Sequence, residues 1–172
     1  MSSPTVSVAL SARALLRWQF RLAHQRLDRA IEPFSGETLQ RHVPGTTAPV
    51  GACYGQIVVC EDVSVNGVLT AGTPLALSTW AGRTGLSELS PLGEPAQWRA
   101  WARGVRLDLA ALRAYAQAVY AATDHSIAAL PDEAFDLTCR DAPACLLSAL
   151  LLTVSMRHGE ITGLLARLPD AV

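Results

Sequence analysis

The sequence contains no lysine, because all 14 of its Lys and Arg residues are arginines. This excludes a Schiff-base lysine and the lysine of a phosphate-binding P-loop anywhere in the chain. Alanine, leucine and glycine are abundant beside this bias, a combination typical of codon usage in a GC-rich genome. The missing lysine is therefore interpreted as a compositional bias and not as a functional signal.

Excess charge and long apolar runs are also missing. The formal net charge is −1 over 172 residues and no basic run occurs, so we expect no nucleic-acid-binding surface. Half of the residues are apolar, which excludes a disordered chain. The longest apolar run, 144–152, is interrupted by Ser148 and is shorter than the ~18 residues of a membrane span. No basic segment precedes Val6–Leu10, so we expect no signal peptide and a cytoplasmic protein with a single domain over 1–172.

Motifs for metal binding and nucleophilic catalysis are absent as well. There is no H-E-x-x-H, no E-x-x-H pair, no glycine-rich phosphate loop and no G-x-S-x-G. The cysteines form no C-x-x-C, so we interpret them as structural thiols in a reducing compartment. They are Cys53, Cys60, Cys139 and Cys145.

Apolar residues recur at helical spacing, and strand-like alternation is nearly absent. The pattern predicts helices over about 9–30, 50–70 and 143–168, and a third helix that runs from beside Pro95 to near Asp124. A short capped turn is expected over 35–40, and one helical turn within 130–138. Between the second and third long helices, 73–95 is rich in Gly, Pro and Ser, which is typical of a surface segment that covers a site. The sequence therefore predicts an all-α four-helix bundle with a long loop between helices 2 and 3.

Polar residues that face the bundle interior are the first candidates for function. With about 100° between successive residues of a helix, apolar side chains surround the direction of Glu61, and Gln56 lies toward Cys53 and Cys60. On the last helix, Arg157 and His158 flank the apolar centre. Glu61 and Arg157 would form an ion pair if they met, either structural or part of a binding site. In the structural alternative, Arg157 extends to water and His158 is an ordinary hydrogen-bonded residue.

The other histidines have weaker patterns. His24 lies among Arg21, Gln25 and Arg26, which predicts a solvent-exposed helix face. His42 and His125 fall in or near expected loops and have no partner at a ligand spacing. None of the three is a candidate ligand.

Three segments, in this order and spacing, resemble the DinB-like family of damage-inducible four-helix proteins. They are Gln56–Leu69 (QIVVCEDVSVNGVL) after Pro44-Gly45-Thr46, Trp80–Leu86 (WAGRTGL), and Gly159-Glu160-Ile161 followed by Leu164-Leu165. The resemblance covers about 15–168. It implies a four-helix bundle, a homodimer as in many relatives, and a central pocket. In relatives, three histidines of this pocket hold nickel or zinc, and a low-molecular-weight thiol is the cosubstrate of transferases or isomerases.

At the three positions where the resemblance implies histidine ligands, this sequence has other residues. Gln56 stands at the second-helix position, and Thr153 and Arg157 stand at the two fourth-helix positions. His158 is one residue late, which turns its side chain about 100° away. No metal site is therefore expected, and the fixed charge of Arg157 would take the place of the cation and pair with Glu61 or Glu160.

Two functions stay open, with a third as a weaker option. The chain is either a divergent member of the metal-dependent thiol-transferase and hydrolase-like superfamily, or a non-catalytic stress-associated or small-molecule-binding bundle without metal. In the first, Arg157 would stabilise an anionic substrate or thiolate, and Glu61 would orient the Arg157 side chain. The weaker option is a sensor that uses 73–95 as a lid. The expected pocket consists of Gln56, Cys60, Glu61, Thr153, Arg157 and His158, and no catalytic residue is assigned. The expected partners are a small molecule and a second copy of the chain, with neither nucleic acid nor a membrane.

Overall fold

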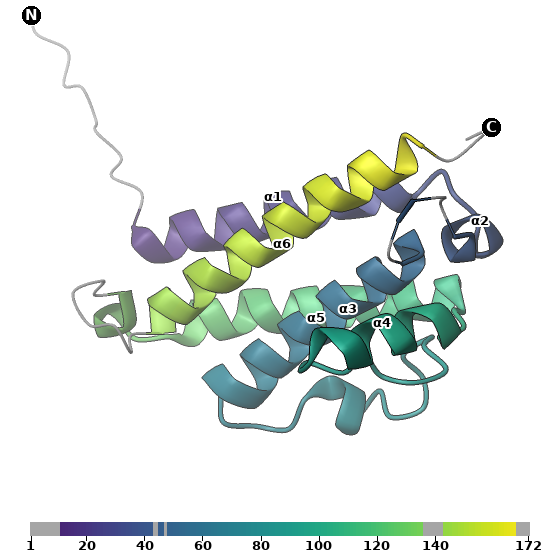
Figure 1. Cartoon of the computed structure of the whole chain (residues 1–172). Helices are drawn as coiled ribbons and strands as arrows, with labels where there is room; N and C mark the ends of the chain where they lie inside the picture. Colours follow the sequence, from purple (N-terminus) through teal and green to yellow (C-terminus); the bar gives the residue numbers. More distant parts are fainter. Residues whose placement is uncertain (1–10, 43–44, 47, 136–142, 168–172) are drawn as a thin grey trace, which may run out of the picture.

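The computed structural model describes residues 11–42, 45–46, 48–135 and 143–167, and this part of the chain is built from helices (Figure 1). None of its helices is long and apolar enough to cross a membrane. The elements are α1 (Ala12–Ile31), α2 (Gly36–Gln40), α3 (Val50–Asp62) with a π-helix (Val63–Leu69), a 3-10 turn (Leu75–Leu77), α4 (Pro95–Gly104), α5 (Leu109–Ala129), a 3-10 turn (Asp132–Phe135) and α6 (Pro143–Leu165).

Four of these helices form the bundle. α1 packs against α5 and α6, and α3 packs against the same two helices. In Figure 1, α1 and α6 run side by side with α5 below them. α1 and α3 are therefore diagonal across the bundle, and their inward side chains meet at its centre. The prediction of an all-α bundle is confirmed.

Most of the helix boundaries follow from local sequence. Ser11 and Ser35 accept hydrogen bonds from backbone amides of the first turns of α1 and α2, which otherwise have no acceptor. The predicted second helix extends from α3 through the π-helix to Leu69, and the expected turn after residue 130 is Asp132–Phe135. His125 lies within α5 and not in a loop. Cys139 lies outside the described residues.

The third predicted helix is wrong in one respect, because it is two helices. α4 ends at Gly104, a residue that disfavours helix, and Asp108 then caps α5 by accepting a hydrogen bond from the Ala111 amide. The intervening segment is extended, and Leu107 pairs with Leu86 of the long loop in an isolated antiparallel bridge. The long loop therefore supplies hydrogen-bond partners that a continuous helix would have excluded.

The loop between α3 and α4 is fastened to the bundle through Asp62. This buried carboxylate accepts hydrogen bonds from the amides of Leu75 and Ala76, both at 2.8 Å. It also accepts from Asn66 Nδ2 at 2.8 Å and from the Tyr115 hydroxyl at 2.7 Å. Apart from the turn Leu75–Leu77, the predicted 73–95 segment is non-helical as far as Glu94. Its first part is held in place by the last residue of α3.

α1 and α5 are joined by a cluster of charges at Asp124. Arg17 and Arg21, one turn apart on α1, each donate two hydrogen bonds to this carboxylate, at 2.7–3.0 Å. These hydrogen bonds, first from Arg17 and then from Arg21, hold the pKa of Asp124 well below its usual range. Two bidentate partners make the cluster stronger than a single surface pair.

We expect Asp124→Asn to lower the free energy of unfolding by about 1 kcal/mol at neutral pH, a value reduced for solvent screening. Because the pKa is lower in the folded chain, this contribution is fully present above about pH 4, the ordinary range of aspartate, and is lost as the pH falls further. Urea unfolding of both proteins between pH 7 and pH 3 measures the difference. Asp132→Asn is the control, since that carboxylate is 90% exposed and, among the described residues, pairs only with Arg13. A difference that persists or grows toward pH 3 would contradict the assignment.

Candidate functional site

A buried polar cluster lies at the centre of the bundle and contains Glu61. The imidazole of His24 donates from Nε2 to Glu61 Oε2 over 3.0 Å, and the Thr123 hydroxyl donates to Glu61 Oε1 over 2.6 Å. Glu61 and Thr123 are fully buried, and His24 is 7% exposed. The three residues come from α3, α5 and α1, so the cluster joins both diagonal helices and one helix between them.

Aromatic rings enclose this cluster. Tyr120 stacks on the His24 ring with 3.7 Å between the ring centroids and an interplanar angle of 10°. Burial raises the pKa of both Tyr54 and Tyr120, so both phenols stay protonated at neutral pH. Because Glu61 has no exposed surface, a substrate could reach the carboxylate only by displacing packed side chains. The cluster is therefore part of the core.

One prediction about these residues is wrong, because His24 is buried and not on a solvent-exposed face. Glu61, one of the two partners expected for Arg157, bonds instead to His24 and Thr123. A helical wheel of α1 contained the missing signal, since His24 lies within about 60° of Phe20, Leu27 and Ile31, all of which are buried. The neighbouring arginines made the segment resemble a solvent-exposed face, although they occupy the outer faces of the same turns.

A second group of candidate residues lies where α3 faces α6. Arg157 donates from Nη1 to Glu160 Oε2 over 2.5 Å, and its guanidinium lies 5.8 Å from the centroid of the Trp98 ring. Thr153, one turn earlier on α6, donates its hydroxyl to the Ala149 carbonyl. Arg157, Glu160, Thr153 and Met156 line a hollow in the surface. Of the two partners expected for Arg157, Glu61 and Glu160, the structure shows the pair with Glu160.

The α3 side of this region carries Gln56 and two cysteines. Burial raises the pKa of Cys53 to about 11, and it also raises the pKa of Cys60. Arg157 is close enough to act on both thiols, but its favourable charge is outweighed by burial. Both thiols are therefore protonated at neutral pH. Gln56 Oε1 is buried and has no hydrogen-bond partner among the residues that the structure describes.

The residues at the three implied ligand positions do not fit nickel or zinc. Arg157 carries a fixed positive charge, and the Thr153 hydroxyl is bonded within its own helix. Zinc and nickel sites in proteins are built from imidazole, thiolate and carboxylate, none of which these three positions supply. Over the described ranges, no three His, Cys, Asp or Glu side chains are grouped so that they could hold a metal ion.

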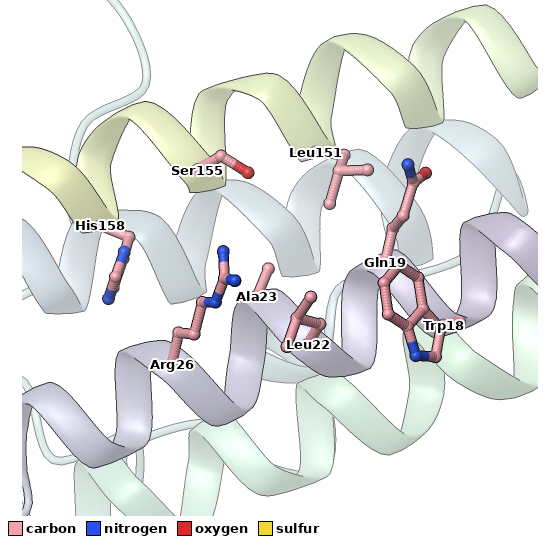
Figure 2. Close-up of a pocket in the computed structure, with 8 residues that line it drawn as sticks. All are labelled: Trp18, Gln19, Leu22, Ala23, Arg26, Leu151, Ser155 and His158. Carbon is pink, nitrogen blue, oxygen red and sulfur yellow. The ribbon is translucent and has the colours of Figure 1, made fainter.

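His158 belongs to a different place from the other predicted pocket residues. It lines a groove between α1 and α6, together with residues that include Trp18, Arg26 and Ser155 (Figure 2). The predicted pocket is therefore divided: Glu61 lies in the core, Thr153 and Arg157 line the hollow on α6 with Cys60 near Arg157, Gln56 is on α3, and His158 lies in this groove. The sequence patterns did not indicate the groove, because Trp18 and Arg26 lie about 130 residues from the α6 residues that complete it.

Comparisons with known proteins agree with this architecture. A solved structure of a conserved protein from Enterococcus faecalis has the same fold, with a TM-score of 0.78 and 15% identity over 93% of this chain and 98% of that chain. No curated protein matches the chain. The family model of the DinB superfamily matches residues 19–170. Since this match spans most of the sequence, the chain belongs to the DinB superfamily.

Proposed function

We propose that this chain is a metal-independent, small-molecule-binding member of the DinB superfamily. The observation that carries the proposal is the Arg157–Glu160 pair at one of the three implied ligand positions. Arginine cannot lose its proton at physiological pH, so Arg157 cannot become a neutral donor to a metal. Its charge, neutralised by Glu160 and lying over the Trp98 ring, takes the place of the metal cation.

The chemistry around Arg157 supports binding over thiol-dependent catalysis. A nucleophilic cysteine reacts as the thiolate, whereas burial keeps Cys53 and Cys60 protonated. The Thr153 hydroxyl donates its hydrogen bond to a backbone carbonyl and not to a basic side chain that could activate it. In the alternative of a divergent transferase, Arg157 would stabilise an anionic substrate, but that substrate would have to displace Glu160 from a 2.5 Å contact. The binding function is therefore the better supported of the two.

Metal content measured on the purified chain tests the proposal. The protein is prepared without a polyhistidine tag, incubated with nickel or zinc, separated from free metal and analysed by mass spectrometry. We expect far less than one metal ion per chain. We also expect no turnover with low-molecular-weight thiols. The triple variant Gln56→His, Thr153→His, Arg157→His restores the implied ligands on the same backbone and serves as the matched comparison.

Two results would overturn the proposal. One is a wild-type chain that takes up as much nickel or zinc as the triple variant and loses it in Gln56→Ala. The other is thiol-dependent turnover by the wild type that Arg157→Ala abolishes. Both readouts are independent of where on the bundle a small molecule binds.

A further inference from the structure

The groove between α1 and α6 is a second site, separate from the α3–α6 face. It has a volume of about 250 Å³. α1 contributes Trp18, Leu22 and Arg26, spaced by one helical turn, and α6 contributes Leu151, Ser155 and His158. Figure 2 shows Arg26 extending from α1 toward α6, and Leu151 and His158 pointing from α6 toward α1. The walls of the groove are therefore side chains from two helices whose packing fixes their spacing.

The groove is cationic at one end, and its other end combines apolar side chains with the amide of Gln19 (Figure 2). Trp18, Leu22 and Leu151 lie toward one end, and Arg26 and His158 lie toward the other. None of the described residues that line it is acidic. This separation of apolar and basic groups matches a ligand with an apolar body and one negative charge.

The charge of Arg26 is not compensated within the described part of the chain. No hydrogen bond or salt bridge of its guanidinium occurs there, whereas Arg17 and Arg21 on the same helix both bind Asp124. A guanidinium can donate two parallel hydrogen bonds to one carboxylate. The exposed guanidinium of Arg26 is free to bind a ligand carboxylate in this way. The Ser155 hydroxyl, between Arg26 and Leu151 in Figure 2, offers a further donor.

We propose that this groove binds a small amphipathic carboxylate, with the carboxylate on Arg26 and the apolar body against Trp18, Leu22 and Leu151. The inference rests on the proposed function and names its ligand class. A flat or aromatic body packs well on the exposed indole of Trp18, which is 58% exposed without a ligand. The volume lies below the about 300–1,000 Å³ of sites for drug-sized ligands, so the ligand is smaller than these.

A matched pair of probes tests this assignment. 3-Phenylpropanoate has an aromatic body and one carboxylate, and 3-phenylpropanamide has the same shape without the charge. Both are titrated into the ¹⁵N-labelled chain, and binding is followed by amide shifts in two-dimensional NMR spectra. We expect saturable shifts for the carboxylate in 18–26 and 151–158, and an affinity for the amide that is about tenfold lower, because it loses the charge-assisted pair.

A pair of arginine variants locates the charge. Arg26→Gln is expected to weaken 3-phenylpropanoate binding about tenfold and to bring it close to that of the amide. Arg29→Gln removes the same charge from an exposed position of α1 outside the groove, and we expect it to leave the affinity unchanged. Circular dichroism verifies that both variants are folded.

Three results would overturn the assignment. They are equal weakening by both variants, equal affinity for the carboxylate and the amide, and shifts in 18–26 and 151–158 that depend on protein concentration without any probe. The last result would mean that a second copy of the chain covers Trp18. None of these results changes the metal content of the wild type, so failure of this inference and failure of the proposed function are distinguishable.

Discussion

Replacing Glu61 by alanine is expected to lower the free energy of unfolding by about 3–5 kcal/mol, because each buried polar group left without a partner costs about 1–3 kcal/mol. The carboxylate is fully buried, and the variant leaves His24 and Thr123 without their acceptor at the centre of the bundle. A cavity adds to the loss. Guanidinium unfolding followed by far-ultraviolet circular dichroism measures this effect, with urea as a second denaturant.

The same truncation at Glu160 serves as the control. Glu160→Ala removes an exposed carboxylate whose partner Arg157 stays hydrated, so we expect a change of less than about 1 kcal/mol. Glu61→Gln separates the effect of side-chain volume from that of charge. The amide fills the same space, but it places a donor NH₂ group at one of the two positions where the carboxylate accepts. A Glu61→Ala variant as stable as Glu160→Ala would show that the cluster does not contribute to the stability of the core.

Replacing Asp62 by alanine is expected to have the second largest effect, a loss of about 3 kcal/mol or more, since hydrogen bonds to charged groups contribute about 1.5–3 kcal/mol each. The variant leaves the Tyr115 hydroxyl and the amides of Leu75 and Ala76 without an acceptor. We also expect amide hydrogen exchange of Leu75 and Ala76 to become much faster than in the wild type. Mass-spectrometric exchange over this segment measures the local effect, and chemical unfolding measures the global one.

Asn66→Ala separates the two roles of Asp62. It removes one donor to the carboxylate and leaves both loop amides bonded, so we expect the exchange of Leu75 and Ala76 to change little. If Asp62→Ala and the wild type show equal protection at these two amides, then other contacts hold the loop, and the role assigned to the carboxylate is wrong.

Local patterns in the sequence were sufficient to predict the fold class. They were not sufficient to predict the break between α4 and α5, which depends on pairing with a residue distant in sequence. The apolar spacing of 98–119 is helical throughout and predicts one helix. The structure breaks it at Gly104 because Leu107 pairs with Leu86, a residue distant in sequence. A helical wheel describes one helix at a time and contains no information about such a partner.

The same limit explains the errors in the candidate site. The wheels placed both Glu61 and Arg157 toward the middle of the bundle, whereas only Glu61 is buried there, because the neighbour of each face depends on the order of the helices around the bundle. α1 is diagonal to α3, so the face of Glu61 meets His24, while Arg157 on α6 lies by Trp98 of α4. The sequence contains no signal for the role of Asp62, because two of its four partners are backbone amides, which nearly every residue carries.

The hydrogen bond between His24 and Glu61 has a consequence for the axial register of the bundle. It joins diagonal helices, so it fixes the height of α1 against α3 and, through the packing between them, of α5 and α6 as well. Sliding α1 by a single turn, about 5.4 Å, would leave the buried imidazole of His24 without its acceptor and would take one of its two donors from Glu61. Apolar contacts alone tolerate such slips far better, since leucine and valine pack in many ways. The pair therefore raises the free energy of misaligned bundles as well as stabilising the native one.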